Sequence, residues 1–385
     1  MEEVTTETAV EIIDDIDAET ASAVVEEVQT EKAIRVLTKA KPKKAGKVMD
    51  GISTEKATEI VEEMDEEPLG ERLTEMSPDE QHAIPPEVQL RKLPNVPAEQ
   101  LTGELPPTVP DDIESPVRDQ PAPGIDRFTL PETPEDDWAP LTTSPAPIDG
   151  ILAKFTRRIS NVTTQVEDLT RIPEGVPGLG AGKIINSLFN IDIGNAEPED
   201  IEAAHVTLWV EQEWLEANQA LKWSIEFTSF DEDLESWVPF PSKRIREDEE
   251  RVYYSVVLPG FSLIAVTGSK ELPKQIFEVT DLVISPEAPA PDQEIAISAR
   301  VTDTSAALAV YPSKLWINDT IESTEKIRVE AGATESSQFT IARPAGDYKV
   351  RVERLLGEFA VSAQPADGAN GLSRCGDCST RGADG

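Results

Sequence analysis

Leu258–Val266 reads LPGFSLIAV and links two strand-like patterns through a Pro-Gly pair. Over residues 252–258, apolar side chains alternate with other side chains, as in a strand that buries one face. Pro259-Gly260 predicts a sharp turn, and the apolar run after it predicts a buried strand. The same alternation recurs upstream in Val206–Val210. Residues 147–270 are therefore expected to form a β-rich module.

Aromatic side chains recur around these strands. The segments Val206–Asn218, Glu235–Pro241 and Leu258–Val266 together resemble the PGF-pre-PGF domain, a β-rich module of archaeal and some bacterial cell-surface proteins. The family has no established chemistry, so the resemblance implies a location rather than an activity. It also implies that the ring residues form the core, whereas contact with a ligand is the alternative. These rings are Trp214, Trp237, Tyr254 and Phe261.

Residues 276–362 predict a β-sandwich of the immunoglobulin kind, because about seven short strands are separated by turn signals at the spacing of a sandwich. No Cys lies in this segment, so an antibody-type disulfide is not expected. The expected strands are Phe277–Ile284, Glu294–Val301, Ser313–Ile317, Glu325–Val329, Ser337–Ile341, Tyr348–Val352 and Phe359–Val361.

The same segment resembles the CARDB domain, a family related to cell adhesion. The resemblance rests on Ile284–Pro286, Leu315–Asp319, Val329–Gly332, Gly346–Val350 and Leu356–Phe359, in this order and spacing. The turn sequence TDTSA departs from the family, which more often has Asn and Gly there. The resemblance implies an extracellular β-sandwich used in adhesion or as a spacer.

A twelve-residue repeat occupies residues 6–77. Small or apolar residues recur at its first position, and in the clearest units the apolar set falls at i, i+3, i+4 and i+7, which draws one stripe along a short helix. Since twelve residues turn the stripe by roughly 120°, short helices wound into a superhelix are expected over residues 1–84. Arg72 replaces an apolar stripe residue and predicts a polar end of the array, and Ser77–Glu80 predicts a capping box. The first positions are Ala9, Ala21, Ala33, Ala45, Ala57 and Leu69.

This pattern of Glu-rich amphipathic repeats resembles the cytosolic N-terminal domain of MgtE-type magnesium transporters. The resemblance implies a superhelical module that either senses Mg²⁺ or serves packing and interaction. No stretch reaches the ~18 apolar residues of a membrane helix, so transport by this chain is excluded.

Two segments predict little folded structure. Residues 85–146 are acidic and rich in proline, which predicts an extended linker, with an SH3-type ligand as the alternative. Residues 363–385 predict a disordered tail that carries Cys375 and Cys378, the only cysteines. A zinc site needs four ligands, so a thiol pair without a metal is expected, and half a zinc knuckle, a redox pair or an intermolecular link are the alternatives.

Charge excludes some partners. Asp and Glu number 74 against 35 Lys and Arg, for a net charge of −39. Such a chain repels nucleic acid and anionic lipid. It attracts cations, but the acidic clusters at Asp14-Asp15, Glu62–Glu67 and Asp231–Asp233 lack the spacing of a Ca²⁺ loop. These clusters have two interpretations: weak binding of Ca²⁺ or Mg²⁺, or an acidic face that contacts solvent.

No constellation of catalytic residues is visible. His82 and His205 lie far apart in the sequence and have no motif partner. Gly178–Lys183 lacks the spacing of a phosphate loop and predicts an inter-strand loop. Two glycosylation sequons begin at Asn161 and Asn318 and matter only in an exported chain.

The sequence thus predicts a multidomain protein: N-terminal all-α superhelical repeats, a β-rich module and a C-terminal immunoglobulin-like β-sandwich, with a Pro-rich linker. We expect no enzyme activity, no cofactor, and a structural or adhesive role at a prokaryotic cell surface, with envelope proteins or glycans as partners. Met1–Val4 shows no signal peptide. A divalent-cation-responsive regulatory module is the alternative.

Overall fold

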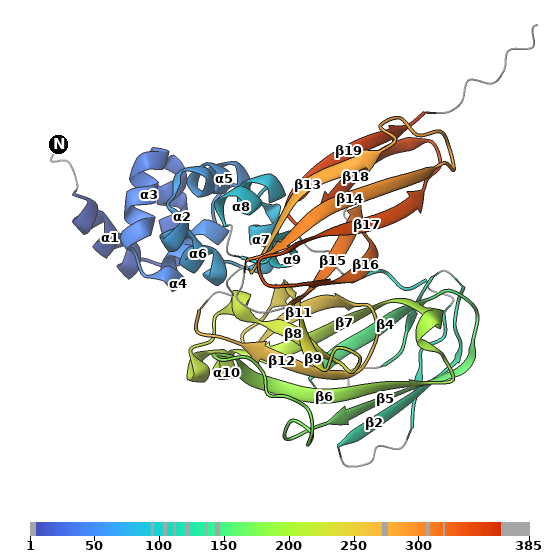
Figure 1. Cartoon of the computed structure of the whole chain (residues 1–385). Helices are drawn as coiled ribbons and strands as arrows, with labels where there is room; N and C mark the ends of the chain where they lie inside the picture. The colour runs from blue at the N-terminus through green and yellow to red at the C-terminus, as the bar shows by residue number, and fades with distance from the viewer. Residues whose placement is uncertain are drawn as a thin grey trace, which may run out of the picture.

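The computed structural model describes residues 5–93, 96–102, 106–110, 113–119, 124–135, 137–142, 147–271, 276–304, 309–318 and 320–362. Figure 1 shows a stack of helices beside two groups of strands. We call these parts the helical array (residues 6–102), the central domain (117–268) and the C-terminal sandwich (277–361). The predicted multidomain fold class is confirmed. Among the described residues, no helix has the length and apolar character needed to cross a membrane.

Each twelve-residue unit forms one short helix, as predicted. Thr5, Asp17 and Ser53 cap α1, α2 and α5 by accepting a hydrogen bond from the backbone of the first turn. The helices are α1 (Thr6–Asp15), α2 (Ala18–Glu27), α3 (Thr30–Lys39), α4 (Pro42–Asp50), α5 (Thr54–Glu63), α6 (Glu66–Glu75), α7 (Pro78–Ala83), α8 (Pro86–Lys92) and α9 (Ala98–Thr102).

Helices two apart in sequence pack together in the first half of the array, so α4 lies against both α2 and α6. Two glycines permit this close approach. A Cβ atom on Gly46 would lie 2.6 Å from Cβ of Glu75, and one on Gly51 would lie 2.4 Å from Oγ of Ser22. The apolar stripes meet in a single core that runs from Ile13 to Leu101.

Two predictions about the end of this array are wrong. Arg72 does not end the array, because α7, α8 and α9 continue it; the side chain is 5% exposed and hydrogen-bonds to the C-terminal turn of α3. Ser77 precedes α7, but its side chain makes no capping hydrogen bond. Its backbone N–H is instead bound by Asp50, 2.9 Å away.

The central domain is a sandwich of two antiparallel sheets. Strand order is β1-β2-β5-β6-β12-β8-β9 in one sheet and β10-β11-β7-β4-β3 in the other. The strands are β1 (Val117–Arg118), β2 (Ile125–Glu132), β3 (Trp138–Pro140), β4 (Ile148–Phe155), β5 (Ser160–Asp168), β6 (Ile184–Gly194), β7 (Ile201–Glu211), β8 (Glu226–Asp231), β9 (Ser236–Pro241), β10 (Lys243–Glu247), β11 (Arg251–Leu258) and β12 (Leu263–Gly268).

Of the four predicted core rings, Tyr254 is fully buried between the sheets. Trp214 and Phe261 are only partly buried and pack against the edge of that core. Trp237 packs with Phe230 on the opposite face of its sheet and donates a hydrogen bond to the carbonyl of Pro177. All four rings therefore have packing roles, although one alone is central.

The structure differs from the extended linker expected over residues 85–146. This segment contains α8, α9, β1, β2 and β3, so the helical array runs past residue 84 and the central domain begins before residue 147. Its prolines occupy positions that tolerate them. Pro86 is the first residue of α8, and Pro140 lies on an edge strand.

The C-terminal sandwich confirms the seven predicted strands, and each is one to five residues longer than predicted. A three-stranded sheet β13-β14-β17 faces a four-stranded sheet β16-β15-β18-β19. The strands are β13 (Phe277–Ser285), β14 (Glu294–Asp303), β15 (Ala309–Ile317), β16 (Thr320–Val329), β17 (Thr334–Ala342), β18 (Gly346–Val352) and β19 (Leu355–Val361). The predicted tail over residues 363–385 lies outside the described residues.

Candidate functional site: the interface between the helical array and the β domains

Lysine side chains stabilise helix ends within the array. The ammonium groups of Lys56 and Lys92 donate to the carbonyls of Val28 and Met64, each 28 residues earlier, over 2.9 and 3.3 Å. Lys44 contacts the carbonyl of Ile16 at the same separation of 28 residues. A cation at a helix C-terminus satisfies unpaired carbonyls and offsets the negative end of the helix dipole. The repeat therefore carries its own capping group.

Carboxylates serve the opposite helix ends. Asp14, Glu26 and Asp50 accept hydrogen bonds from the backbone N–H groups of residues 41, 53 and 77, at 3.3, 2.9 and 2.9 Å. Each pair is 27 residues apart. The hydrogen bonds from Ser53 lower the pKa of Glu26, whereas burial raises the pKa of Asp50. Each interaction ties a helix to one that is three units away.

Arg244 of β10 extends this arrangement across the domain boundary. Its side chain is 0% exposed, and its guanidinium donates to the carbonyls of Leu73 and Thr74 at 3.1 and 3.0 Å. It also donates to Oε1 of Gln81 at 2.5 Å. The central domain thus supplies the cation for the C-terminal end of α6.

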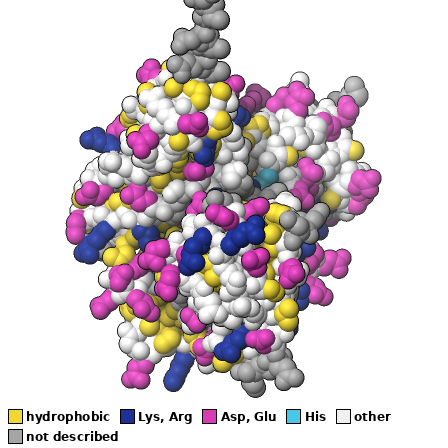
Figure 2. Space-filling model, turned by 90° about the vertical axis from the view of Figure 1, so that its right-hand side faces the viewer, with side chains coloured by type: hydrophobic (Ala, Val, Ile, Leu, Met, Phe, Trp, Pro, Cys, Tyr) yellow, Lys and Arg dark blue, Asp and Glu magenta, His cyan; other side chains and the backbone are white. Residues whose placement is uncertain are grey.

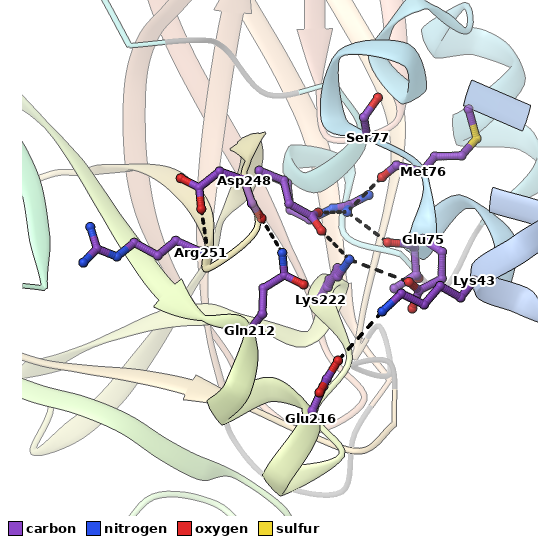
Figure 3. A network of polar contacts seen from close by, with 12 residues as sticks. Lys43, Glu75, Met76, Ser77, Gln212, Glu216, Lys222, Asp248 and Arg251 are labelled. Atoms are coloured by element: carbon purple, nitrogen blue, oxygen red, sulfur yellow. Dashed lines mark hydrogen bonds and ion pairs between the residues drawn. The ribbon is translucent and has the colours of Figure 1, made fainter. Parts of the chain in front are cut away.

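A charged network surrounds this arginine. Nη1 of Arg244 lies 3.7 Å from a carboxylate oxygen of Glu247. Lys222 bridges Glu247 and Glu75, at 2.7 and 3.7 Å. Figure 3 shows Lys222 reaching Glu75 of the array, and Lys43 reaching Glu216 of the central domain. Burial lowers the pKa of Arg244, although the nearby acidic groups oppose that shift. Pairing compensates in part for burying the charge.

An aromatic ring of the central domain also belongs to the core of the array. Trp223 is 0% exposed and packs within the apolar cluster of the helices, with the Arg244 guanidinium 5.8 Å from the centre of its ring. Gln100 of α9 donates to the carbonyl of Ile225, over 3.0 Å. The interface therefore combines apolar packing with buried hydrogen bonds.

Arg354, in the turn between β18 and β19, caps the array from the C-terminal sandwich. Its guanidinium donates to the carbonyls of Leu90 and Leu93 at 2.6 and 2.9 Å, and it also contacts the carbonyl of Val96. Leu93 follows the last residue of α8. Both β domains thus hold the same end of the helical array.

The two β domains also contact each other. Lys326 of β16 pairs with Asp231 of β8 over 2.7 Å. Burial works to raise the pKa of Asp231, but the hydrogen bonds from Lys326 and the N–H of Leu234 outweigh it and lower the pKa. Val310 of β15 belongs to the apolar core of the central domain. Every pair among the three parts is therefore in contact through named side chains.

The two histidines lie in different parts of the molecule. His205 of β7 is 2% exposed, with Nε2 3.0 Å from Oγ of Ser255 and its ring against Trp138. Burial and the charge of Lys314 lower its pKa to about 3. His82 of α7 lies at the interface, where burial and the charges of Lys243 and Arg244 lower its pKa to about 3. Both are neutral at pH 7, and the structure does not bring them together.

The other predicted candidates have structural roles. Gly178–Lys183 lies in the loop between β5 and β6, where Lys183 contacts Glu226 of β8. Among the described residues, no group of three or more His, Cys, Asp or Glu side chains could hold a metal ion. The side chains of Glu66 and Glu67, and both Cys375 and Cys378, lie outside the described residues. Figure 2 shows carboxylates spread over the visible face, with Lys and Arg between them.

A groove of about 500 Å³ lies where β16 and β17 approach the central domain. Its three glutamates already have partners. Glu202 pairs with Lys154, Glu322 contacts Arg343, and Glu325 accepts the backbone N–H of Gln338. The groove therefore offers no unpaired carboxylate to a ligand. Its lining residues are Glu202, Glu322, Ser323, Thr324, Glu325, Gln338, Phe339, Thr340 and Ile341.

Sequence reasoning missed the residues of the interface. Arg244 lies between Lys243 and Arg246 in a strand-like segment, Arg354 lies in a turn, and no local pattern distinguishes them from exposed basic residues. The spacing of Lys44 and Lys56 by one repeat was a usable signal for capping within the array. That spacing could not show that Arg244 and Arg354 of the two β domains also cap helix ends of the array.

Residues 1–113 match the family model described as the MgtE intracellular N domain. The match supports the resemblance for the helical repeats. It extends beyond residue 84, in agreement with the presence of α8 and α9 in the array. No curated protein matches this chain.

Proposed function

We propose that this chain is a non-catalytic interaction scaffold in which a helical array and two β domains form one body. The observation that carries the proposal is Arg244, a fully buried cation whose guanidinium donates its hydrogen bonds, among the described residues, to the helical array. Breaking such a contact leaves a buried charge and several buried carbonyls unpaired, which costs several kcal/mol. The geometry therefore favours a fixed arrangement of surfaces over independent modules on flexible tethers.

The finer proposal is display at a prokaryotic cell surface, with envelope proteins or glycans as partners. It is supported by the resemblance of the central domain to PGF-pre-PGF modules and of the C-terminal sandwich to CARDB modules. The family matched by residues 1–113 is described as intracellular, which argues for the opposite location. Because the interface joins all three parts, the helices and strands share one compartment, and a single localisation experiment decides for the whole chain.

Labelling of intact cells tests this proposal. A membrane-impermeant amine reagent should modify exposed lysines such as Lys349 and Lys32 on whole cells, while a cytosolic marker stays unmodified. Tryptic peptides identify the labelled positions in both parts of the chain. Labelling of this protein only after lysis would reject surface display and leave an intracellular scaffold.

The alternative is a divalent-cation-responsive module, which the family match favours. In the structure, Asp14, Glu26 and Asp50 already accept backbone hydrogen bonds. Titration calorimetry of the full chain with Mg²⁺ and with Ca²⁺ separates the two functions. Saturable, stoichiometric heat at sub-millimolar metal supports a cation response, and heats that match dilution into buffer support the inert scaffold.

A further inference from the structure

The two ends of the helical array differ in how their apolar stripes are covered. The stripe residue at i+3 is 47% exposed in α1 (Ile12) and 47% exposed in α2 (Val24). The equivalent residue is half-buried in α3 (Val36). It is 0% exposed in α4 (Val48) and in α5 (Ile60). The i+3 residue is thus equally exposed in α1 and α2, and its exposure then falls to zero by α4.

The order of packing explains this gradient. α3, α4, α5 and α6 each pack against the helix two places before them. α1 and α2 have no such helix among the described residues. Ile12 and Val24 therefore remain exposed on the side where a preceding helix would lie. We call Ile12, Val24 and Val36 the open end of the array.

The polar groups of the open end also lack the partners that the equivalent groups have further along the array. Lys32 stands one repeat before Lys44 and two before Lys56, whose ammonium groups cap helix C-termini. Lys32 is exposed and has no partner among the described residues. Gln29 precedes α3 and stands one repeat before residue 41, whose N–H is bound by Asp14, but no described side chain accepts the N–H of Gln29. The ammonium group of Lys32 and the N–H of Gln29 therefore occupy the positions that contact another helix elsewhere in the array.

The rim beside Ile12 and Val24 is acidic, whereas α3 carries Lys32, Arg35 and Lys39 around Val36. Glu11 and Asp15 flank Ile12 and Glu27 follows Val24, and all three carboxylates are exposed. None has an ion-pair partner among the described residues, in contrast to Glu7, which pairs with Lys39 at 2.9 Å. An apolar stripe edged by free carboxylates complements an apolar stripe edged by cations.

We propose that the open end binds an amphipathic α-helix of a partner protein, with apolar residues at i, i+3, i+4 and i+7 and Lys or Arg beside them. The stripe of the partner covers Ile12, Val24 and Val36, its cations meet the acidic rim, and Lys32 caps its C-terminal carbonyls. The inference rests on the proposed interaction role and names the class of partner. It does not depend on the location of the protein.

A second copy of the chain is the competing occupant. Two open ends placed face to face would bring together the carboxylates beside Ile12 and Val24 of both copies, in a molecule whose net charge is −39. Like charges across an interface oppose association, and screening relieves this only at high salt. The charge pattern therefore favours a basic helix over self-association.

Fluorescence anisotropy with the purified full chain tests the proposal. The probe is a labelled synthetic helix of about 18 residues, with Leu at the stripe positions and Lys beside them. A matched peptide with Glu in place of Lys controls for charge. The double variant Ile12→Glu/Val24→Glu should weaken binding at least about ten-fold, as expected for loss of a central apolar contact. Val283→Glu, at an exposed site on the C-terminal sandwich (54%), should bind like the parent chain.

Several outcomes decide the proposal. Saturable binding of the Lys peptide that the double variant loses, with helical circular dichroism unchanged, supports it. If the double variant unfolds, Lys32→Gln replaces it, removes the capping cation without adding a carboxylate, and should also weaken binding. Absence of saturable binding, or binding by Lys32→Gln and by the folded double variant that equals binding by the parent chain, overturns the proposal. So does a dimer in sedimentation that Ile12→Glu dissolves, which makes a second copy the occupant. None of these results bears on surface labelling, so the proposed function stands or falls separately.

Discussion

The helical array and the C-terminal sandwich differ in where they obtain the side chains that complete their apolar cores and pair their backbone groups. The sandwich contains its own apolar clusters, formed by residues between Phe277 and Val361. The array takes Trp223 into its core and receives Arg244 and Arg354 at its helix ends, all from the β domains. The difference teaches that a repeat array, in which each unit contacts only its neighbours, needs closure from outside.

The strongest test of this comparison is Arg244→Ala. It leaves the carbonyls of α6 buried without their donor and leaves Lys222 as the one cation beside Glu247 among the described residues, so we expect destabilisation by about 3–5 kcal/mol. Hydrogen exchange should rise across α6 and α7 while the sandwich stays protected. Arg300→Ala, which removes an exposed ion pair of 3.5 Å, is the control and should change stability by less than about 1 kcal/mol. Uniform loss of protection in all parts would contradict the comparison.

Ile297→Ala tests the other half of the comparison, the core of the C-terminal sandwich. Ile297 is 0% exposed in the core of the sandwich, and its truncation should cost about 2–5 kcal/mol through lost burial and a cavity. Because that core is self-contained, we expect faster exchange in β14 and its neighbours and unchanged exchange in α1–α5. If the helices lose protection to the same extent, the array depends on the sandwich core as well as on Arg354.

Gly46→Ala isolates packing inside the array. The added Cβ would meet the backbone of Glu75 at 2.8 Å, so α4 and α6 must separate, at a cost of about 1–3 kcal/mol. A lower midpoint of helical circular dichroism on heating is the readout. Gly180→Ala, with no atom within 4 Å of the new Cβ, serves as control and should leave the midpoint unchanged.

Acid should weaken the folded protein through its two buried histidines. The folded-state pKa of His82 and of His205 is about 3, below the ordinary 6.5. The stability that each neutral imidazole contributes is therefore full above pH 6.5 and is lost as pH falls toward 3. Each histidine adds a slope of at most about 1.4 kcal/mol per pH unit. Urea unfolding between pH 7 and pH 5 should show a reduced slope in His82→Gln and in His205→Gln; a slope unchanged in both variants would refute this account.

The sequence predicted the repeating elements and failed where structure depends on distant contacts. The period of Ala9, Ala21 and Ala33 foretold one helix per unit, and alternation foretold the strands of the sandwich, because both signals are local. Arg244 acts on carbonyls 170 residues away, and no local pattern encodes that distance. Residues 85–146 were misread because proline also fits the first turn of a helix and an edge strand. His82 and His205 had no motif partner in the sequence, and their burial was not visible there.

The separations of 27 and 28 residues between capping partners have a consequence for how such an array changes in evolution. An insertion or deletion of a few residues would shift every later capping group away from its target, whereas duplication of a whole unit would renew each pairing with the next neighbour. The C-terminal end of the array is held by Arg244 and Arg354, whose positions are fixed by the two β domains. Growth or shortening by whole units is therefore tolerated at the N-terminal side, and the length of the array is free to vary while its attachment stays constant.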